Sequence, residues 1–156
     1  EDMLDKLDIK DDYLGASKTF VRVELLPPDG VKSLMDPLDR WTLRVDQDVT
    51  PEWWDAEADR QRVEEAVEAW RKEHVFAEGG HVVKAGKVYA FGSATVEAYN
   101  SATVTAFGSA TVEAYDSATV TASGSATVKA CNRAIVIYPF AKKIVYPAGW
   151  AAETHD

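Results

Sequence analysis

Residues 90–137 read AFGSATVE AYNSATVT AFGSATVE AYDSATVT ASGSATVK ACNRAIVI, which is one eight-residue phrase written six times without a break. A short fixed period means that a single unit cannot bury its apolar side alone and must stack on its neighbours. The stretch therefore predicts a solenoid of stacked strands. The repeat defines an architecture and names no substrate.

Each octad predicts one short strand and one corner. The Thr-Val pair and its flanking alanines favour a strand, while Gly, Asn or Asp at the third position tolerates the left-handed backbone angles of a tight corner. The corners are expected at residues 92, 100, 108, 116, 124 and 132. Because eight is even, alternate residues keep the same side in every octad. The first strand is expected to bury Ala94, Val96 and Ala98 and to expose Thr95 and Glu97.

A second, longer period is superimposed on the eight-residue one. The corner residue alternates between Gly and Asn or Asp, and the eighth residue alternates between Glu and Thr over the first four octads. The unit is therefore sixteen residues, which predicts a two-sided coil with one octad per side. A three-sided coil would have a wider core, which Ala and Val fill poorly. It stays open only if the aromatic residues beside the corners turn inward, namely Phe91, Tyr99, Phe107 and Tyr115.

A two-sided coil has two unlike faces, because parallel coils stack about 4.8 Å apart and like residues form ladders. One face is expected to carry Thr95, Thr111 and Thr127 beside Glu97, Glu113 and Lys129, edged by Phe91 and Phe107. The other is expected to carry Thr103, Thr105, Thr119 and Thr121, edged by Tyr99 and Tyr115, before it turns apolar at Ile135 and Ile137. Such ladders stabilise a sheet in their own right.

The front of the chain predicts a small α+β unit. Apolar residues alternate over residues 20–26 up to the turn Pro-Pro-Asp-Gly, and again from Trp41 to Val45, which predicts two strands. Thr50 and Pro51 then resemble an N-cap and a first helical position. The helix should end near His74, with a buried stripe formed by Val63, Val67 and Trp70.

These elements define a mainly β protein, a small parallel β-solenoid with an N-terminal α+β cap that contains one long amphipathic helix. The octad frame extends outward over HVFAEGGH and VVKAGKVY before the clean repeats and YPFAKKIV after them. Degenerate terminal repeats are expected, since one of their faces ends the stack. The acidic cap is predicted over residues 1–75, the solenoid over 76–147 and a C-terminal tail over 148–156.

The phrase Ser-Ala-Thr-Val-x-Ala-Tyr-Asp/Gly, over residues 82–137, resembles the octapeptide repeats of many uncharacterised bacterial and phage proteins. The resemblance implies a small parallel β-helix. Small β-helical proteins of phages and mobile elements often bind and block a host protein, as pentapeptide-repeat proteins do to topoisomerases. This chain lacks the pentapeptide pattern, so no residue role is carried over from them.

The charge and composition of the chain limit the classes of partner and the cellular location that we expect. The net charge of −9 lies in residues 1–73, which hold 20 acidic and 11 basic residues, against 6 and 6 in residues 74–156. Direct nucleic-acid binding needs clustered Lys and Arg, which this distribution lacks. No apolar run approaches the ~18 residues that span a bilayer, and no signal segment opens the chain. Cys131 has no internal disulfide partner, which indicates a reducing, cytoplasmic location.

Motifs for catalysis are missing. His74, His81 and His155 lack metal-ligand spacing, and no nucleophile elbow or phosphate loop is present. Glu97 and Glu113 would stack on one ladder like a glycosidase pair, but Lys129 follows on the same ladder and relieves their repulsion. We therefore expect no enzyme, no cofactor and no metal.

The expected function is non-enzymatic binding, in which the acidic surface blocks a host protein that has a basic surface. The candidate contacts are Trp53, Trp54, Asp55, Glu57, Glu64 and Glu68, although a core role for both tryptophans is the plainer reading. One alternative is an ice- or polysaccharide-binding surface made of the Thr103, Thr105, Thr119 and Thr121 ladders with Tyr99 and Tyr115. Another is self-assembly, as a homodimer through a solenoid end or face.

Overall fold

The computed structural model of the chain describes residues 21–47, 50–137 and 143–145. The C-terminal tail predicted at 148–156 lies outside these residues. The chain forms two compact units, and the boundary between them in the sequence lies between Ala69 and Trp70. Each unit is described by itself below.

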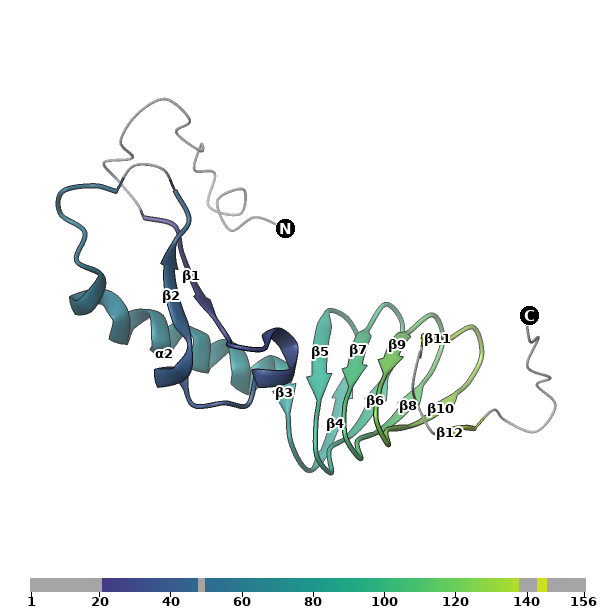
Figure 1. The fold of residues 1–156 in the computed structure, drawn as a ribbon. Helices are drawn as coiled ribbons and strands as arrows, with labels where there is room; N and C mark the ends of the chain where they lie inside the picture. The colour runs from purple at the N-terminus through teal and green to yellow at the C-terminus, as the bar shows by residue number, and fades with distance from the viewer. Residues whose placement is uncertain (1–20, 48–49, 138–142, 146–156) are drawn as a thin grey trace. The chain divides into compact units, whose positions relative to one another are not determined.

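The first unit contains the two predicted strands. Strand β1 (Val23–Leu26) pairs antiparallel with β2 (Thr42–Val45), with Leu25 opposite Leu43 (Figure 1). Between them lie two short 3-10 helices, η1 (Gly30–Ser33) and η2 (Leu38–Arg40). The side chains of Leu25, Leu34 and Trp41 are buried and form the apolar core of this unit.

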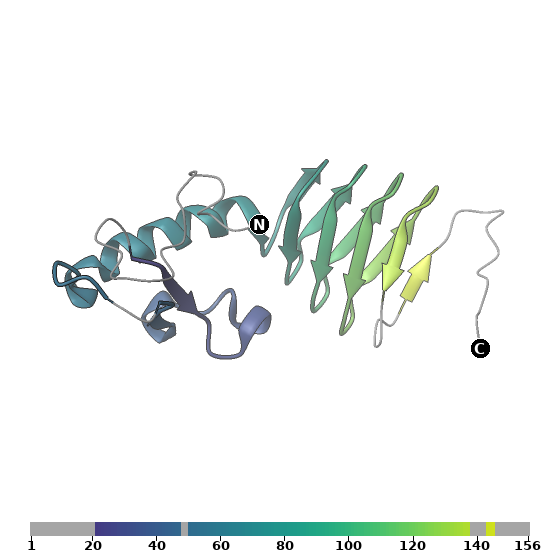
Figure 2. The ribbon, with the colours of Figure 1, turned by 90° about the horizontal axis from the view of Figure 1, so that it is seen from above.

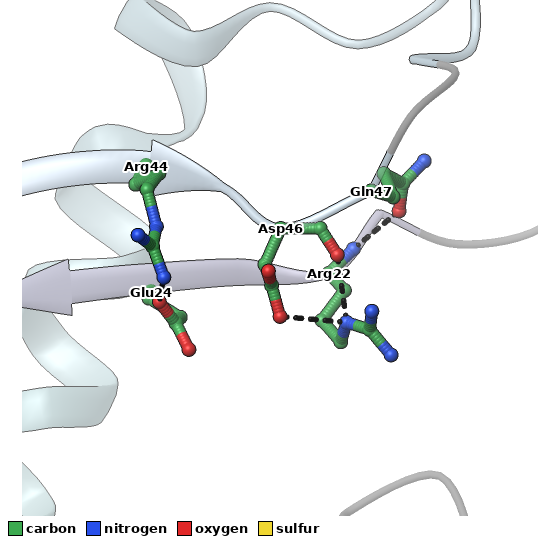
Figure 3. A network of polar contacts seen from close by, with 5 residues as sticks. All are labelled: Arg22, Glu24, Arg44, Asp46 and Gln47. Atoms are coloured by element: carbon green, nitrogen blue, oxygen red, sulfur yellow. Dashed lines mark hydrogen bonds and ion pairs between the residues drawn. The ribbon is translucent and has the colours of Figure 1, made fainter.

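Charged residues pair across the two strands (Figure 3). Arg44 and Glu24, directly opposite each other in the register, form an ion pair. The Arg22 guanidinium Nε lies 3.1 Å from Asp46 Oδ2, and the Arg22 backbone N–H donates to Gln47 Oε1 at 2.7 Å. Part of the charge of the acidic half is therefore neutralised within the strand pair.

Helix α2 (Ala56–His74) ends at the predicted residue but begins later than predicted. The N-cap is Asp55, whose Oδ1 accepts the backbone N–H groups of Glu57 at 3.0 Å and Ala58 at 3.2 Å. Thr50 and Pro51 lie outside the helix, so their predicted capping roles are wrong. A carboxylate that accepts two of the otherwise unpaired N–H groups of the first turn is a strong helix start.

The predicted buried stripe of α2 is also wrong, since no residue of the helix is fully buried. Val63 and Val67 are half-buried, and Trp70 is 38% exposed. The Trp70 ring is held by other rings rather than by enclosure, because it stacks on His74 with centroids 5.1 Å apart.

The second unit contains the solenoid, built from two parallel five-stranded sheets. Sheet I consists of β4 (Gly80–Val83), β6 (Thr95–Ala98), β8 (Thr111–Ala114), β10 (Thr127–Ala130) and β12 (Lys143–Val145). Sheet II consists of β3 (Val75–Phe76), β5 (Lys87–Ala90), β7 (Thr103–Ala106), β9 (Thr119–Ala122) and β11 (Ile135–Ile137). Figure 2 shows the coils following one another along the solenoid.

The register confirms the two-sided coil of sixteen residues. Thr95 pairs with Thr111 in sheet I, and Thr103 pairs with Thr119 in sheet II. The interior holds the predicted alanines and valines, whose largest fully buried side chains are Val96, Val104, Val112, Val120 and Val128. The aromatic residues beside the corners stay half-buried at the surface, so the three-sided alternative is wrong.

Left-handed backbone marks all six predicted corners. The φ angles are +54° at Gly92, +63° at Gly108 and +70° at Gly124. At the alternate corners Asn100, Asp116 and Asn132 have φ between +52° and +57°. The Gly/Asn/Asp alternation of the sequence thus corresponds to one corner type on each edge of the solenoid.

The first coil departs from the octad frame. Gly80 pairs with Thr95 and Val75 with Tyr89, offsets of fifteen and fourteen residues. The frame extended outward over residues 74–86 is therefore wrong by one or two positions, whereas Lys87 and Val88 pair with Thr103 and Val104 as the sixteen-residue period requires. Residues 84–86 turn this corner in three residues, where 99–102 use four.

The shorter corners move His81 into register with the interior residue Val96. The His81 ring stacks on Phe76 with centroids 3.8 Å apart, and its Nε2 lies 2.8 Å from the Glu78 carbonyl oxygen. The imidazole thus stands at the register position where the octads place valine, and it stacks on Phe76, which itself packs against the core.

Candidate functional site

The interior of the solenoid leaves no room for a reaction, because its Ala and Val side chains from Ala90 to Ala130 are fully buried. Across the described part of the chain, no three His, Cys, Asp or Glu side chains are grouped so as to hold a metal ion. Candidate sites therefore lie on outer surfaces. Three such surfaces carry the chemistry that the sequence pointed to.

The first surface, named here the Trp53 patch, consists of Glu52, Trp53, Trp54, Asp55 and Glu57. The Trp53 side chain is 55% exposed, so a core role for both tryptophans is wrong. Trp54 is half-buried and meets the Trp53 ring edge-on, with centroids 6.5 Å apart and ring planes at 82°. Three exposed carboxylates flank the pair in sequence. The patch thus combines an aromatic anchor with negative charge.

The remaining predicted contacts, Glu64 and Glu68, lie further along α2. Spacings of seven and eleven residues from Glu57 are close to whole helical turns, so the three glutamates share one face of the helix. Glu64 Oε1 lies 2.7 Å from Arg60 Nε, and that arginine also donates to the backbone oxygens of Leu38 and Trp41. Glu64 therefore also serves the internal packing of the first unit.

The second surface is the outer face of sheet I. Tyr99 donates its hydroxyl hydrogen to Glu97 Oε2 at 2.8 Å, and Tyr115 donates to Glu113 Oε2 at 2.5 Å. Lys129 Nζ lies 3.5 Å from the other carboxylate oxygen of Glu113. The tyrosine hydroxyls thus turn to the glutamate face and not to the threonine face that they were expected to edge.

These hydrogen bonds explain two shifted pKa values. The bond from Tyr115, followed by the attraction of Lys129, lowers the pKa of Glu113 below its ordinary 4.5. The same bond raises the pKa of Tyr115, since the hydroxyl must keep its proton to donate. Both oxygens of Glu113 are engaged, which leaves this carboxylate poorly placed as a nucleophile or base.

Replacing Tyr115 by phenylalanine is expected to raise the Glu113 pKa towards 4.5, as measured by NMR titration of the side-chain carboxyl. A carboxyl with a lowered folded-state pKa stabilises the protein above its unfolded-state pKa and loses that effect as the pH falls through the folded value. The Tyr115→Phe protein should therefore lose less stability between about pH 4.5 and the lowered pKa of Glu113. Lys129→Met should also raise the pKa of Glu113, because the charge and the hydrogen bond of Lys129 both lower it.

The third surface is the outer face of sheet II. Thr103 and Thr105 pair in register with Thr119 and Thr121, as predicted. Ile135 and Ile137 continue the two ladders and are 56% and 51% exposed. Phe91 and Phe107, which directly follow β5 and β7, stack on each other with centroids 4.9 Å apart.

Sequence reasoning missed an aromatic cluster at the other end of this face. Tyr89 is in register with Thr105, and its ring centroid lies 6.2 Å from that of Trp70. Lys87 Nζ lies 5.3 Å from the centre of the Tyr89 ring. The octad frame could have indicated half of this cluster, because it places Tyr89 sixteen residues before Thr105 on the same face. The pattern of α2 instead predicts a buried position for Trp70.

No helix in the described part of the chain is both long and apolar enough to cross a membrane. Comparison with protein-family models, curated proteins and solved structures finds no match to this chain.

Proposed function

We propose that the protein is a non-enzymatic binding protein that occupies a basic surface of another protein through its acidic N-terminal unit. The observation that carries the proposal is the exposure of Trp53, 55% of whose side chain is open to solvent beside carboxylates. An exposed tryptophan is costly in water and is a common anchor of protein interfaces.

The chemistry of the patch favours a partner rich in Arg or Lys. A guanidinium can stack on an indole face while neighbouring carboxylates accept its hydrogen bonds. Glu52, Asp55 and Glu57 supply that charge, and the half-buried Trp54 ring supports Trp53 from one side. The negative charge also speeds encounter with a basic surface.

The partner class follows from the charge and from the repeat. The surplus of acid in residues 1–73 favours a nucleic-acid-binding enzyme, whose own site is basic. The resemblance of the octads to repeats of bacterial and phage proteins supports an inhibitor of a host protein, encoded by a phage or mobile element. A single cysteine, Cys131, fits action in the reducing cytoplasm.

Replacing Trp53 by alanine is expected to weaken capture of the partner at least tenfold, since truncating an interface hot spot costs about 2 kcal/mol or more. The measurement is quantitative mass spectrometry of proteins captured from bacterial lysate at low salt. Met35→Ala is the matched control, because Met35 is another exposed apolar side chain of the same unit, 43% exposed.

Charge is tested separately with Glu57→Gln against Glu65→Gln, both on exposed positions of α2. Only the Glu57 change should weaken capture and flatten its salt dependence. Equal capture by the wild-type, Trp53→Ala and Met35→Ala proteins would remove the Trp53 patch as the docking surface.

A further inference from the structure

The outer face of sheet II is a nearly uncharged platform with a definite order along the solenoid. One ladder runs Lys87, Thr103, Thr119, Ile135, and its neighbour runs Tyr89, Thr105, Thr121, Ile137. Lys87 is the one charged residue among the outward positions of β5, β7, β9 and β11, and none of these is acidic. These four strands are separated by three inter-strand spacings, so this part of the face extends roughly 14 Å at ~4.8 Å per spacing.

The aromatic end of this platform is held in place before any ligand arrives. Trp70 stacks on His74 with ring planes 10° apart and meets Tyr89 at 60°. His74 Nδ1 lies 2.8 Å from the Trp70 carbonyl oxygen, which ties the stacked imidazole to the same helical turn. Trp70 nevertheless remains 38% exposed. A ring that is both fixed and open loses little entropy when a flat apolar surface packs on it.

The middle of the platform offers hydroxyls in a regular array. The side chains of Thr103, Thr105, Thr119 and Thr121 are half-buried, and their hydroxyls have no hydrogen-bond partner among the residues that the structure describes. Their spacing is set by the register, about 4.8 Å between coils and about 7 Å along a strand. Each hydroxyl can both donate and accept. A ligand that presents hydroxyl groups at repeated intervals is complementary to such an array.

From this order of groups we propose that the outer face of sheet II binds a linear, uncharged polysaccharide of β-linked pyranose units. Such a chain has flat rings with apolar faces, which pack on Trp70 and Tyr89, and equatorial hydroxyls, which bond to the threonines. The exposed methyl groups of Ile135 and Ile137 receive the apolar face of a further ring. A charged chain would require several opposite charges, where the four strands supply only Lys87.

Ice is the other ligand that a threonine array suggests. Ice presents one flat lattice plane, and only two ranks of paired threonines occur here before the ladders change to Lys87 and Tyr89 at one end and to isoleucines at the other. An aromatic end suits a sugar ring and serves no purpose against a lattice. This site is separate from the Trp53 patch and does not depend on it.

The test measures binding of cellohexaose and chitohexaose to the full chain by isothermal titration and NMR. Trp70→Ala and the double variant Thr105→Val/Thr121→Val are each expected to weaken binding about tenfold. Valine keeps the branched shape of threonine and removes the hydroxyl, so the second variant should retain the fold. The matched control is Thr95→Val/Thr111→Val, the same change on sheet I, which should leave affinity within about twofold.

Several results would overturn the proposal. These are no binding of either oligosaccharide by the wild-type protein, preference for a charged chain such as alginate, or an equal loss in the sheet I control. Thermal hysteresis of the wild-type protein that disappears in Thr105→Val/Thr121→Val, without oligosaccharide binding, would assign the face to ice.

Discussion

Gly92→Ala is expected to destabilise the solenoid by about 2–5 kcal/mol. Alanine at φ +54° carries the ~1–2 kcal/mol penalty of the left-handed region. Its Cβ would also lie 2.7 Å from the Ala77 backbone oxygen. That oxygen accepts the Ser93 N–H at 3.0 Å, so the Ala77 backbone cannot retreat without losing this bond. Forced contacts in packed protein add about 1–3 kcal/mol.

Gly108→Ala provides the matched control. Its φ is +63°, yet the nearest atom to an added Cβ, the Gly92 nitrogen, is 3.7 Å away. It should therefore lose only the ~1–2 kcal/mol of the backbone term. Urea unfolding followed by circular dichroism measures both variants. Equal losses of stability in the two variants would mean that the Ala77 backbone moves away from the added Cβ at no cost.

Val112→Asp is expected to abolish cooperative folding of the solenoid. Val112 is fully buried on β8, between sheet I neighbours Val96 and Val128. A carboxyl at this position would be surrounded by alanine and valine side chains, which offer no hydrogen-bond partner. Burying an unpaired polar group costs several kcal/mol even when the group is neutral. Whole domains are stable by only about 5–15 kcal/mol. Loss of the dispersed amide resonances of residues 94–130 in NMR spectra is the readout.

Two further variants test whether the loss comes from burying the carboxyl group or merely from adding one to the strand. Thr111→Asp introduces the same carboxyl one residue earlier, on the outer face, and should fold. Val112→Thr keeps the shape and buries one hydroxyl, so a loss of about 1–3 kcal/mol is expected. A Val112→Asp protein with native spectra would mean that the core admits water, contrary to its zero exposure.

The repeat made the solenoid predictable because each octad repeats the same local steric demand. Gly92 and Asn100 turn corners for reasons contained in their own side chains, and the even period dictates which residues face inward. The first coil could not be predicted in this way. Its short corners are made possible by Gly79 and Gly86, with φ of +78° and +82°, but nothing near them in sequence specifies that one residue is dropped.

The candidate surfaces, like the fold, could be predicted from the sequence only in part. Adjacent tryptophans cannot face one way, so the exposure of Trp53 was within reach of pattern reasoning. The Trp70–Tyr89 contact was not, because it joins residues nineteen positions apart across an irregular first coil. The direction of the tyrosine hydroxyls was equally hidden, because parity says which side a strand residue takes and says nothing of residues at a corner.

The sixteen-residue register has a consequence for how such a gene can change. Duplication or loss of sixteen codons adds or removes one whole rung, and every residue beyond it keeps its face. A change of eight codons preserves strands and corners yet exchanges the faces, so that glutamates would continue a threonine ladder. Recombination among near-identical repeats can thus lengthen both surfaces together when it adds sixteen codons. Selection for the function of either surface would remove insertions or deletions of eight codons.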